Sequence, residues 1–143
     1  MKIYIGNDHT AVEMKNSIVN YLLENGYEVE NLGVDTSDPS DYPDLGHNVA
    51  NKVANDKYSK GIIICGTGIG ISIAANKVKG IRAALCYEIE TTKMARKHND
   101  ANILALGARI IANQKAILLV EEFLKTDFEG GRHQNRINKI DTI

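Results

Sequence analysis

The sequence predicts an α/β protein in which a parallel β-sheet lies between two layers of helices. Apolar, β-branched stretches alternate along the 143 residues with stretches of helical period, which is the pattern of parallel strands joined by crossover helices. The most apolar stretch, Gly61–Cys65, is suited to burial on both faces of a sheet. Right-handed crossovers would give a Rossmann-like three-layer α/β/α sandwich with five parallel strands. The length fits a single domain over residues 1–143.

The first half of the chain is expected to form two strands and two helices. They are a strand at Lys2–Gly6, a helix at Thr10–Asn25, a strand at Tyr27–Leu32 and a helix at Pro43–Asn55. Thr10 and Glu13 have the spacing of a capping box, and Gly26 is placed to end the first helix. The polar loop Gly33–Asp41 is interpreted as a rim or lid of a ligand site.

The second half repeats the alternation. Its elements are expected as a strand at Gly61–Cys65, a helix from about Gly70 to Lys79, a strand at Ile81–Leu85, a helix at Glu88–Lys97, a strand at Ile103–Leu106, a helix at Asn113–Lys125 and a short last helix after Gly131. Gly80 is expected to close the helix before it. This pattern leaves the order of the strands in the sheet open.

Composition and charge exclude several kinds of partner. Seventeen basic against eighteen acidic residues leave a net charge of −1, so there is no polybasic field for nucleic acid or an anionic membrane. The apolar runs are too short for a membrane span or a secretion signal. Cys65 and Cys86 are too far apart for a CxxC motif, which favours free thiols in a reducing cytoplasm.

Chemically useful residues follow three of the predicted strands. Asp8 and His9 follow the first strand, Cys65 ends the third and Arg109 follows the fifth. Ligands of open parallel sheets bind at the carboxyl ends of the strands, so we expect these residues at one edge. An isolated Asp-His pair is more often a helix N-cap and its neighbour, which is the alternative for Asp8.

The segment Cys65-Gly66-Thr67-Gly68-Ile69-Gly70 places a thiol before a turn of small residues. Such a turn lets backbone N–H groups approach a ligand, and the positive end of the following helix stabilises a thiolate or an oxyanion. Ile71 excludes a dinucleotide fingerprint, a Walker A loop and a Cys-x5-Arg phosphatase loop. The alternative is a structural turn with an inert buried cysteine.

Two further groups lie outside these strand ends. His98 and Asn99 end a basic helix and are either a C-terminal cap or a source of a titrating histidine beside the thiol. Arg132 and Arg136 stand at i, i+4, so both guanidiniums can hold one anion, unless they form a solvated basic face. His133 is expected to point away from this arginine face. A metal site formed by Asp8, His9, Cys65 and His98 is conceivable, but no typical ligand spacing supports it.

These motifs together resemble the type B ribose-5-phosphate isomerases across nearly the whole chain. The matching segments are Asp8-His9, CGTGIGISIAANK at 65–77, GIRAAL at 80–85, RKHNDANILALGAR at 96–109 and EGGRHQNR at 129–136. The related galactose-6-phosphate isomerase subunits share parts of these motifs. They are less similar around the Asp-His and His-Asn-Asp segments.

The resemblance implies an aldose–ketose isomerase of the non-oxidative pentose phosphate pathway, free of metal and cofactor, that interconverts ribose 5-phosphate and ribulose 5-phosphate. It implies that Cys65 is the base and that His98, helped by Asp8, opens the furanose ring. The implied substrate contacts are Asp8, His9, Gly66, Thr67, Gly68, Ile69, Gly70, Asn99, Arg109, Arg132 and Arg136. Family members are homodimers or dimers of dimers whose sites are built from two chains. The alternatives are a galactose-6-phosphate or allose-6-phosphate isomerase and a non-catalytic sugar-phosphate-binding module.

Overall fold

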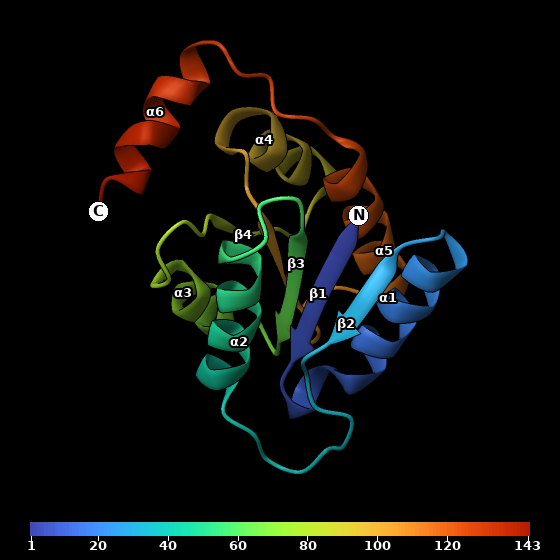
Figure 1. Ribbon diagram of the computed structural model, residues 1–143. Coiled ribbons are helices and arrows are strands. Elements are labelled where there is room, and N and C mark those ends of the chain that lie inside the picture. The colour runs from blue at the N-terminus through green and yellow to red at the C-terminus, as the bar shows by residue number, and fades with distance from the viewer.

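The computed structural model describes residues 1–143 and contains one five-stranded sheet (Figure 1). The strands are β1 (Lys2–Asn7), β2 (Glu28–Asn31), β3 (Lys60–Cys65), β4 (Ala83–Leu85) and β5 (Ile103–Gly107). All neighbouring strands are parallel, in the order β2-β1-β3-β5-β4. The structure therefore confirms the predicted fold class and supplies the strand order.

Helices cover both faces of the sheet (Figure 1). They are the 3-10 turn η1 (His9–Ala11) and the helices α1 (Val12–Glu24), α2 (Tyr42–Ala54), α3 (Ile69–Asn76), α4 (Ile89–Asn99), α5 (Asn113–Lys125) and α6 (Arg132–Asp141). Side chains of α1, α4 and α5 form one hydrophobic core with the sheet, and those of α2 and α3 form the other. Helix α6 stands away from the sheet and packs against α4 (Figure 1). No helix has the length and apolar character needed to cross a bilayer.

The period-two alternation of strand side chains decides which way the central strand β3 presents its residues. Ile62 and Ile64 belong to the core beneath α1 and α5, whereas Ile63 and Cys65 belong to the core beneath α2 and α3. Consequently the Cys65 side chain lies on the face of the sheet where α3 begins.

Some predicted boundaries and one predicted cap differ from the structure. The Thr10–Glu13 capping box is wrong: Asp8 caps the first turn, because its extended backbone brings Oδ1 within 3.0 Å of the Thr10 amide nitrogen. Helix α3 ends at Asn76, and Gly80 lies in the turn beyond it with φ +87°. That turn delays β4 to Ala83, two residues later than predicted.

Candidate active site

The topological switch point of this sheet lies between β1 and β3, because the chain leaves β1 toward helices on one face and leaves β3 toward α3 on the other. Ligands of open parallel sheets bind in the crevice expected at such a point, at the carboxyl ends of the two strands. The Asp8 amide donates to the Ile64 carbonyl at 3.1 Å, and the Ala108 amide donates to the Cys65 carbonyl at 2.9 Å. Cys65 therefore lies between the segments that follow β1 and β5, and the structure brings Asp8, His9, Cys65 and Arg109 to one edge.

Cys65 is held against the turn that follows it. Its side chain is 5% exposed, and Sγ accepts a hydrogen bond from the Gly68 amide at 3.2 Å. Gly68 has φ +82°, and a Cβ there would lie 2.6 Å from Leu85 Cδ1 and 2.7 Å from the Leu106 carbonyl oxygen. Only glycine fits this position without strain. The N-terminus of α3 begins at the next residue, so its free amides and its dipole face the thiol.

Two more polar residues, Thr67 and Arg109, border this edge. Thr67 is exposed, its Oγ1 accepts from the Ile69 amide at 3.1 Å, and its carbonyl accepts from the Tyr87 hydroxyl at 2.7 Å. The exposed Arg109 side chain lies beside Gly66, where a Cβ would be 3.6 Å from Nη1. A fixed turn and a forked cation thus border the same crevice, which suits an anionic ligand.

His9 is oriented by the loop at residues 33–41. The His9 amide donates to Ser40 Oγ at 3.0 Å, and the Ser40 amide donates to His9 Nδ1 at 3.2 Å. Because Nδ1 accepts this hydrogen bond, the proton of a neutral His9 is on Nε2, which can donate to a ligand.

The same loop is anchored a second time by Lys15. This side chain is fully buried, and Nζ donates to the Val34 carbonyl at 3.0 Å and to the Asp35 carboxylate. Lys15, and then Asn31, hold the pKa of the exposed Asp35 carboxyl below its usual value. Lys15 was not among the predicted site residues, although a lysine on the apolar face of the first helix was a signal of a buried ion pair.

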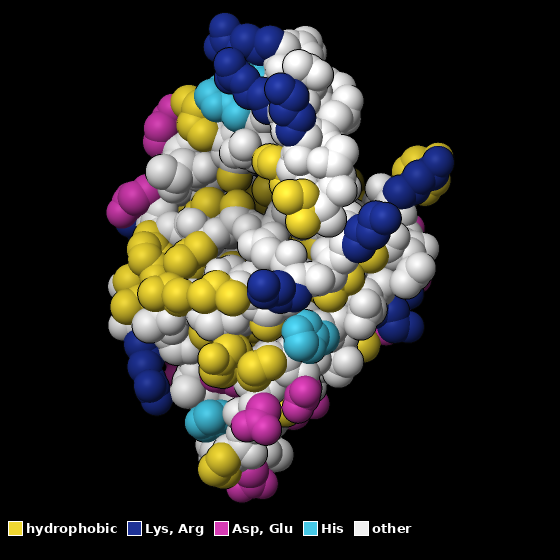
Figure 2. Space-filling view, turned by 90° about the vertical axis from the view of Figure 1, so that its left-hand side faces the viewer, with side chains coloured by type: hydrophobic (Ala, Val, Ile, Leu, Met, Phe, Trp, Pro, Cys, Tyr) yellow, Lys and Arg dark blue, Asp and Glu magenta, His cyan; other side chains and the backbone are white.

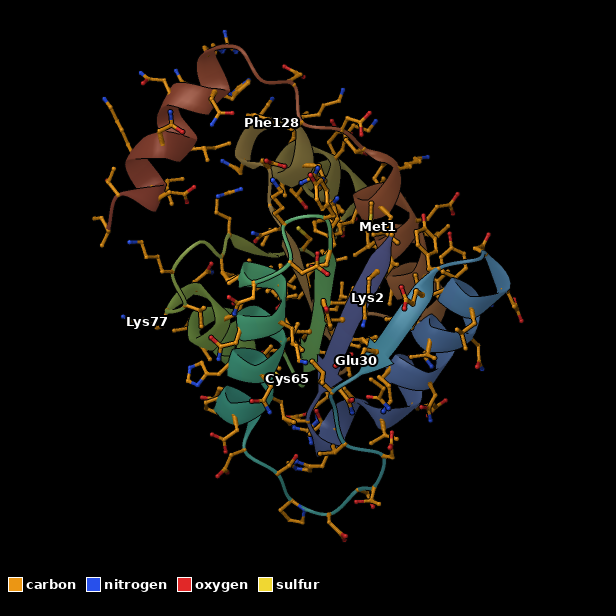
Figure 3. The ribbon with its side chains drawn as sticks, viewed as in Figure 1. Met1, Lys2, Glu30, Cys65, Lys77 and Phe128 are labelled. Atoms are coloured by element: carbon orange, nitrogen blue, oxygen red, sulfur yellow. The ribbon has the colours of Figure 1, made fainter.

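The remaining predicted residues lie at the opposite edge of the sheet. His98 and Asn99 end α4, and the Asn102 carbonyl that follows accepts from the Gly61 amide at 2.9 Å, at the start of β3. In Figure 3, Cys65 lies at the lower end of the strands and Phe128, in the linker to α6, lies above the upper end. A six-residue strand separates the two edges by about 17–20 Å.

The prediction of His98 beside the thiol is therefore wrong within one chain, because α4 returns the chain to the amino ends of the strands. The conceivable metal set of Asp8, His9, Cys65 and His98 fails for the same reason. His9 was predicted to lie at the same edge as Cys65, and the structure confirms this position.

This second edge carries a stacked histidine pair. The rings of His98 and His133 lie 4.4 Å apart at an interplanar angle of 17°, and Glu129 Oε1 lies 3.6 Å from His133 Nε2. Ligand atoms of these three residues lie within 4.8 Å of one another, but nearly parallel rings direct their lone pairs side by side instead of toward one ion. Arg132 and Arg136 are exposed whereas His133 is buried, which confirms that His133 points away from the arginine face.

The fold is that of an α/β protein of Rossmann-like architecture, and it places a buried thiol, a glycine turn and an exposed arginine at the carboxyl ends of its central strands. The chain belongs to the Ribose/Galactose Isomerase family, whose sequence model matches residues 3–140. It is 45% identical to ribose-5-phosphate isomerase B of Escherichia coli K12 over 142 residues, which cover 99% of this chain and 95% of that protein.

Solved structures of similar proteins share the whole fold. Ribose-5-phosphate isomerase B of Clostridium thermocellum has a TM-score of 0.97 and 49% identity, covering 99% of this chain and 96% of that one. Ribose-5-phosphate isomerase B of Mycoplasma genitalium with bound ribulose-5-phosphate has a TM-score of 0.96 and 43% identity, covering 99% and 94%.

Proposed function

We infer that this chain is an aldose–ketose isomerase that interconverts D-ribose 5-phosphate and D-ribulose 5-phosphate, a step of the non-oxidative pentose phosphate pathway. The observation that carries this function is the crevice at Cys65, Gly68 and Arg109 in a chain of this family. The relative from Mycoplasma genitalium, with bound ribulose-5-phosphate, supports the choice of substrate. Residues 1–143 act as one sugar-phosphate isomerase domain in this proposal.

The reaction moves one proton between two carbons. The Cys65 thiolate removes the proton from C2 of the open-chain aldose, and the electron pair of that C–H bond forms an enediolate with its charge on O1. The Cys65 thiol then returns a proton to C1 and becomes a thiolate again, while the hydrogen of O2 passes to O1, which leaves a carbonyl at C2 and gives the ketose. Amides of the turn Gly66–Gly70 are placed to stabilise the enediolate oxygen at the N-terminus of α3. Each of these steps uses groups of the chain itself.

The ring-opening and phosphate-binding groups come from a second chain in this proposal. His98, Asn99, Arg132 and Arg136 lie at the edge opposite Cys65, so a complete site requires a homodimer in which the Cys65 edge of one chain meets the α4–α6 edge of its partner. His98 then opens the furanose ring with help from Asp8, while His9, Arg109 and the α6 arginines bind substrate, chiefly its phosphate.

Exposed apolar side chains support this pairing. They surround the Cys65 edge and continue along the end of α6, namely Tyr42, Ile69, Ile73, Ile110, Ile140 and Ile143. Figure 2 shows hydrophobic side chains as a band across this face, with a cluster of Lys and Arg side chains at the top of the view. Solvent-exposed apolar surface of this kind marks interfaces between chains.

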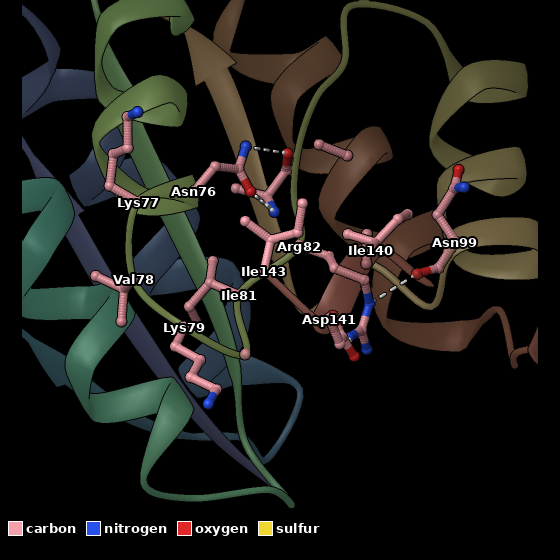
Figure 4. A pocket seen from close by; sticks show the side chains of 14 residues that line it. Asn76, Lys77, Val78, Lys79, Ile81, Arg82, Asn99, Ile140, Asp141 and Ile143 are labelled. Atoms are coloured by element: carbon pink, nitrogen blue, oxygen red, sulfur yellow. Dashed lines mark hydrogen bonds and ion pairs between the residues drawn. The ribbon is translucent and has the colours of Figure 1, made fainter. Parts of the chain in front are cut away.

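A cavity of about 600 Å³ separates the end of α6 from α3 and β4 (Figure 4). Arg82 lines this cavity and joins the ends of α4 and α6. Its Nη1 donates to the Asp141 carboxylate at 2.7 Å, and its Nε donates to the Asn99 carbonyl at 2.9 Å. These contacts fix the end of α6 at one side of the cavity, and in this proposal the cavity receives a segment of the partner. The resulting assembly is a homodimer or a dimer of dimers.

The compartment in this proposal is a reducing one, as in the cytoplasm, because the base must remain a thiol. Both cysteines are free. Neither a nucleic acid nor a membrane is a partner.

The direct test is conversion of ribose 5-phosphate, followed by ¹H NMR in the presence of a chelator. We expect turnover without added metal. Cys65→Ala should abolish it and retain sugar-phosphate binding, because the thiol acts in the transition state. Cys86→Ala is the matched control, since that thiol is also buried but belongs to the opposite core.

Two outcomes would favour the alternatives. Faster turnover of galactose 6-phosphate or allose 6-phosphate would reassign the substrate to a six-carbon sugar. Binding of all three sugar phosphates without conversion would instead indicate a sugar-phosphate-binding module. Loss of turnover with chelator and its return with zinc or manganese would contradict the metal-free mechanism.

A further inference from the structure

His133 occupies a position that the proposed chemistry does not use. It is a histidine in the first turn of α6, 5% exposed, and its ring lies flat against that of the half-buried His98 at 4.4 Å. The two residues come from different helices, so the stack is a tertiary contact between α4 and α6. Burial of a polar side chain is costly, so the place of His133 against the proposed ring-opening residue His98 calls for an explanation.

The stack is one of several contacts that hold α6 against α4. His133 and Ile137, one turn apart, are the buried residues of this helix, whereas Arg132 and Arg136 are exposed. The linker is tied to α4 nearby, because the Glu129 amide donates to the Lys97 carbonyl at 3.1 Å. The stack therefore fixes the plane of the His98 ring, whereas Ile137 and the linker bond keep α6 and its arginine pair in place without it.

We propose that His133 is a positioning residue, a flat platform that holds the His98 ring in the orientation needed to open the sugar ring in the site of the partner chain. This inference rests on the proposed function.

The charge of the platform is consistent with that role. Burial, and then the nearby His98 and Arg132, lower the pKa of His133, while Glu129 opposes this shift. Arg136 also lowers the pKa of His133. A neutral His133 ring does not repel a protonated His98, so the stack can persist whether His98 is neutral or charged. Glu129 Oε1 lies 3.6 Å from Nε2 of this ring.

The experiment separates ring opening from proton transfer. Ribulose 5-phosphate is acyclic, because its C5 oxygen carries the phosphate, so exchange of its C1 hydrogen with D₂O reports enediolate formation alone. Conversion of ribose 5-phosphate also requires opening of the furanose ring. Both rates are measured by ¹H NMR for wild type, His133→Ala, His133→Phe and Gln134→Ala, the last being an exposed neighbour on α6.

We expect His133→Ala to lower conversion about tenfold or more, since a displaced catalytic ring is costly, and to leave C1 exchange within about threefold of wild type. His133→Phe retains a flat ring and should recover most of the conversion. Gln134→Ala should match wild type in both rates.

Three results would overturn the inference. They are unchanged conversion in His133→Ala, an equal fall of conversion and exchange, and a phenylalanine variant as poor as the alanine variant. An equal fall would mean that His133 merely supports the fold. Wild-type C1 exchange tests the proposed function itself, whereas the ratio of conversion to exchange tests His133, so the two failures are distinguishable.

Discussion

Mixing two inactive variants tests whether each site is shared between chains. Cys65 and His98 lie at opposite edges of the sheet, about 17–20 Å apart by strand length, and no side chain spans that gap. In a dimer with shared sites, a Cys65→Ala chain paired with a His98→Asn chain has one site with both alterations and one site with none. Random re-pairing of equal amounts makes about half of the dimers mixed, so about a quarter of wild-type activity should return.

The assay refolds the two variants together and measures conversion of ribose 5-phosphate against each variant refolded alone. The matched control mixes Cys65→Ala with Asp8→Asn, which alter the same edge, so every mixed site retains one defect and no activity should return. Failure of the first mixture to regain activity would refute the shared site. Recovery in the control mixture would refute the assignment of Asp8 and Cys65 to the same side.

Four other outcomes follow from named contacts. Arg136→Ala should lower kcat/KM for ribose 5-phosphate about ten- to a hundredfold, mainly through KM, because a charge-assisted phosphate contact is worth about 1.5–3 kcal/mol; an equal loss on ribose would make the arginine structural. Gly68→Ala places a side chain on a backbone with φ +82°, so the free energy of unfolding measured in urea should fall by about 1–3 kcal/mol. The kcat should also fall, because the amide of residue 68 moves away from Cys65 Sγ. The pKa of His133 is lowered on folding, so its stabilising contribution is present above about pH 6.5 and is lost as pH falls further; the drop in Tm between neutral and acidic buffer should be smaller in His133→Phe, and an equal drop would contradict this. Lys15→Met removes three hydrogen bonds and should lower Tm by about 4–8 °C, whereas an unchanged Tm would show that the loop anchor contributes no stability.

The fold was predictable because hydrophobic period is a local property. Met14, Ile18 and Leu22 repeat at helical spacing and are all buried, and the apolar run that ends at Cys65 became the central strand. The Cys65 turn was also predictable, because its glycines are required by the backbone at that point. Helix boundaries were less predictable: Asp8 Oδ1 accepts from both the amide and the hydroxyl of Thr10, so Asp8, at the end of its strand, caps the first turn in place of Thr10.

The site was only partly predictable because its decisive contacts are long-range. The position of His98 follows from connectivity, since a crossover helix ends at the amino edge of the sheet whatever the chemistry of its last residue. The pairs His98–His133 and His9–Ser40 join segments that no periodic pattern relates. Such contacts depend on where a loop or a separate helix packs, which is decided by the tertiary structure.

The separation of the two edges has a consequence for how activity depends on concentration. If neither edge is complete alone, catalysis and association share one equilibrium, and specific activity declines on dilution below the dissociation constant of the dimer. A sugar phosphate held by Cys65 of one chain and by the arginines of the other touches both chains at once. Such a ligand favours the dimer by mass action, so the substrate would strengthen the assembly that converts it.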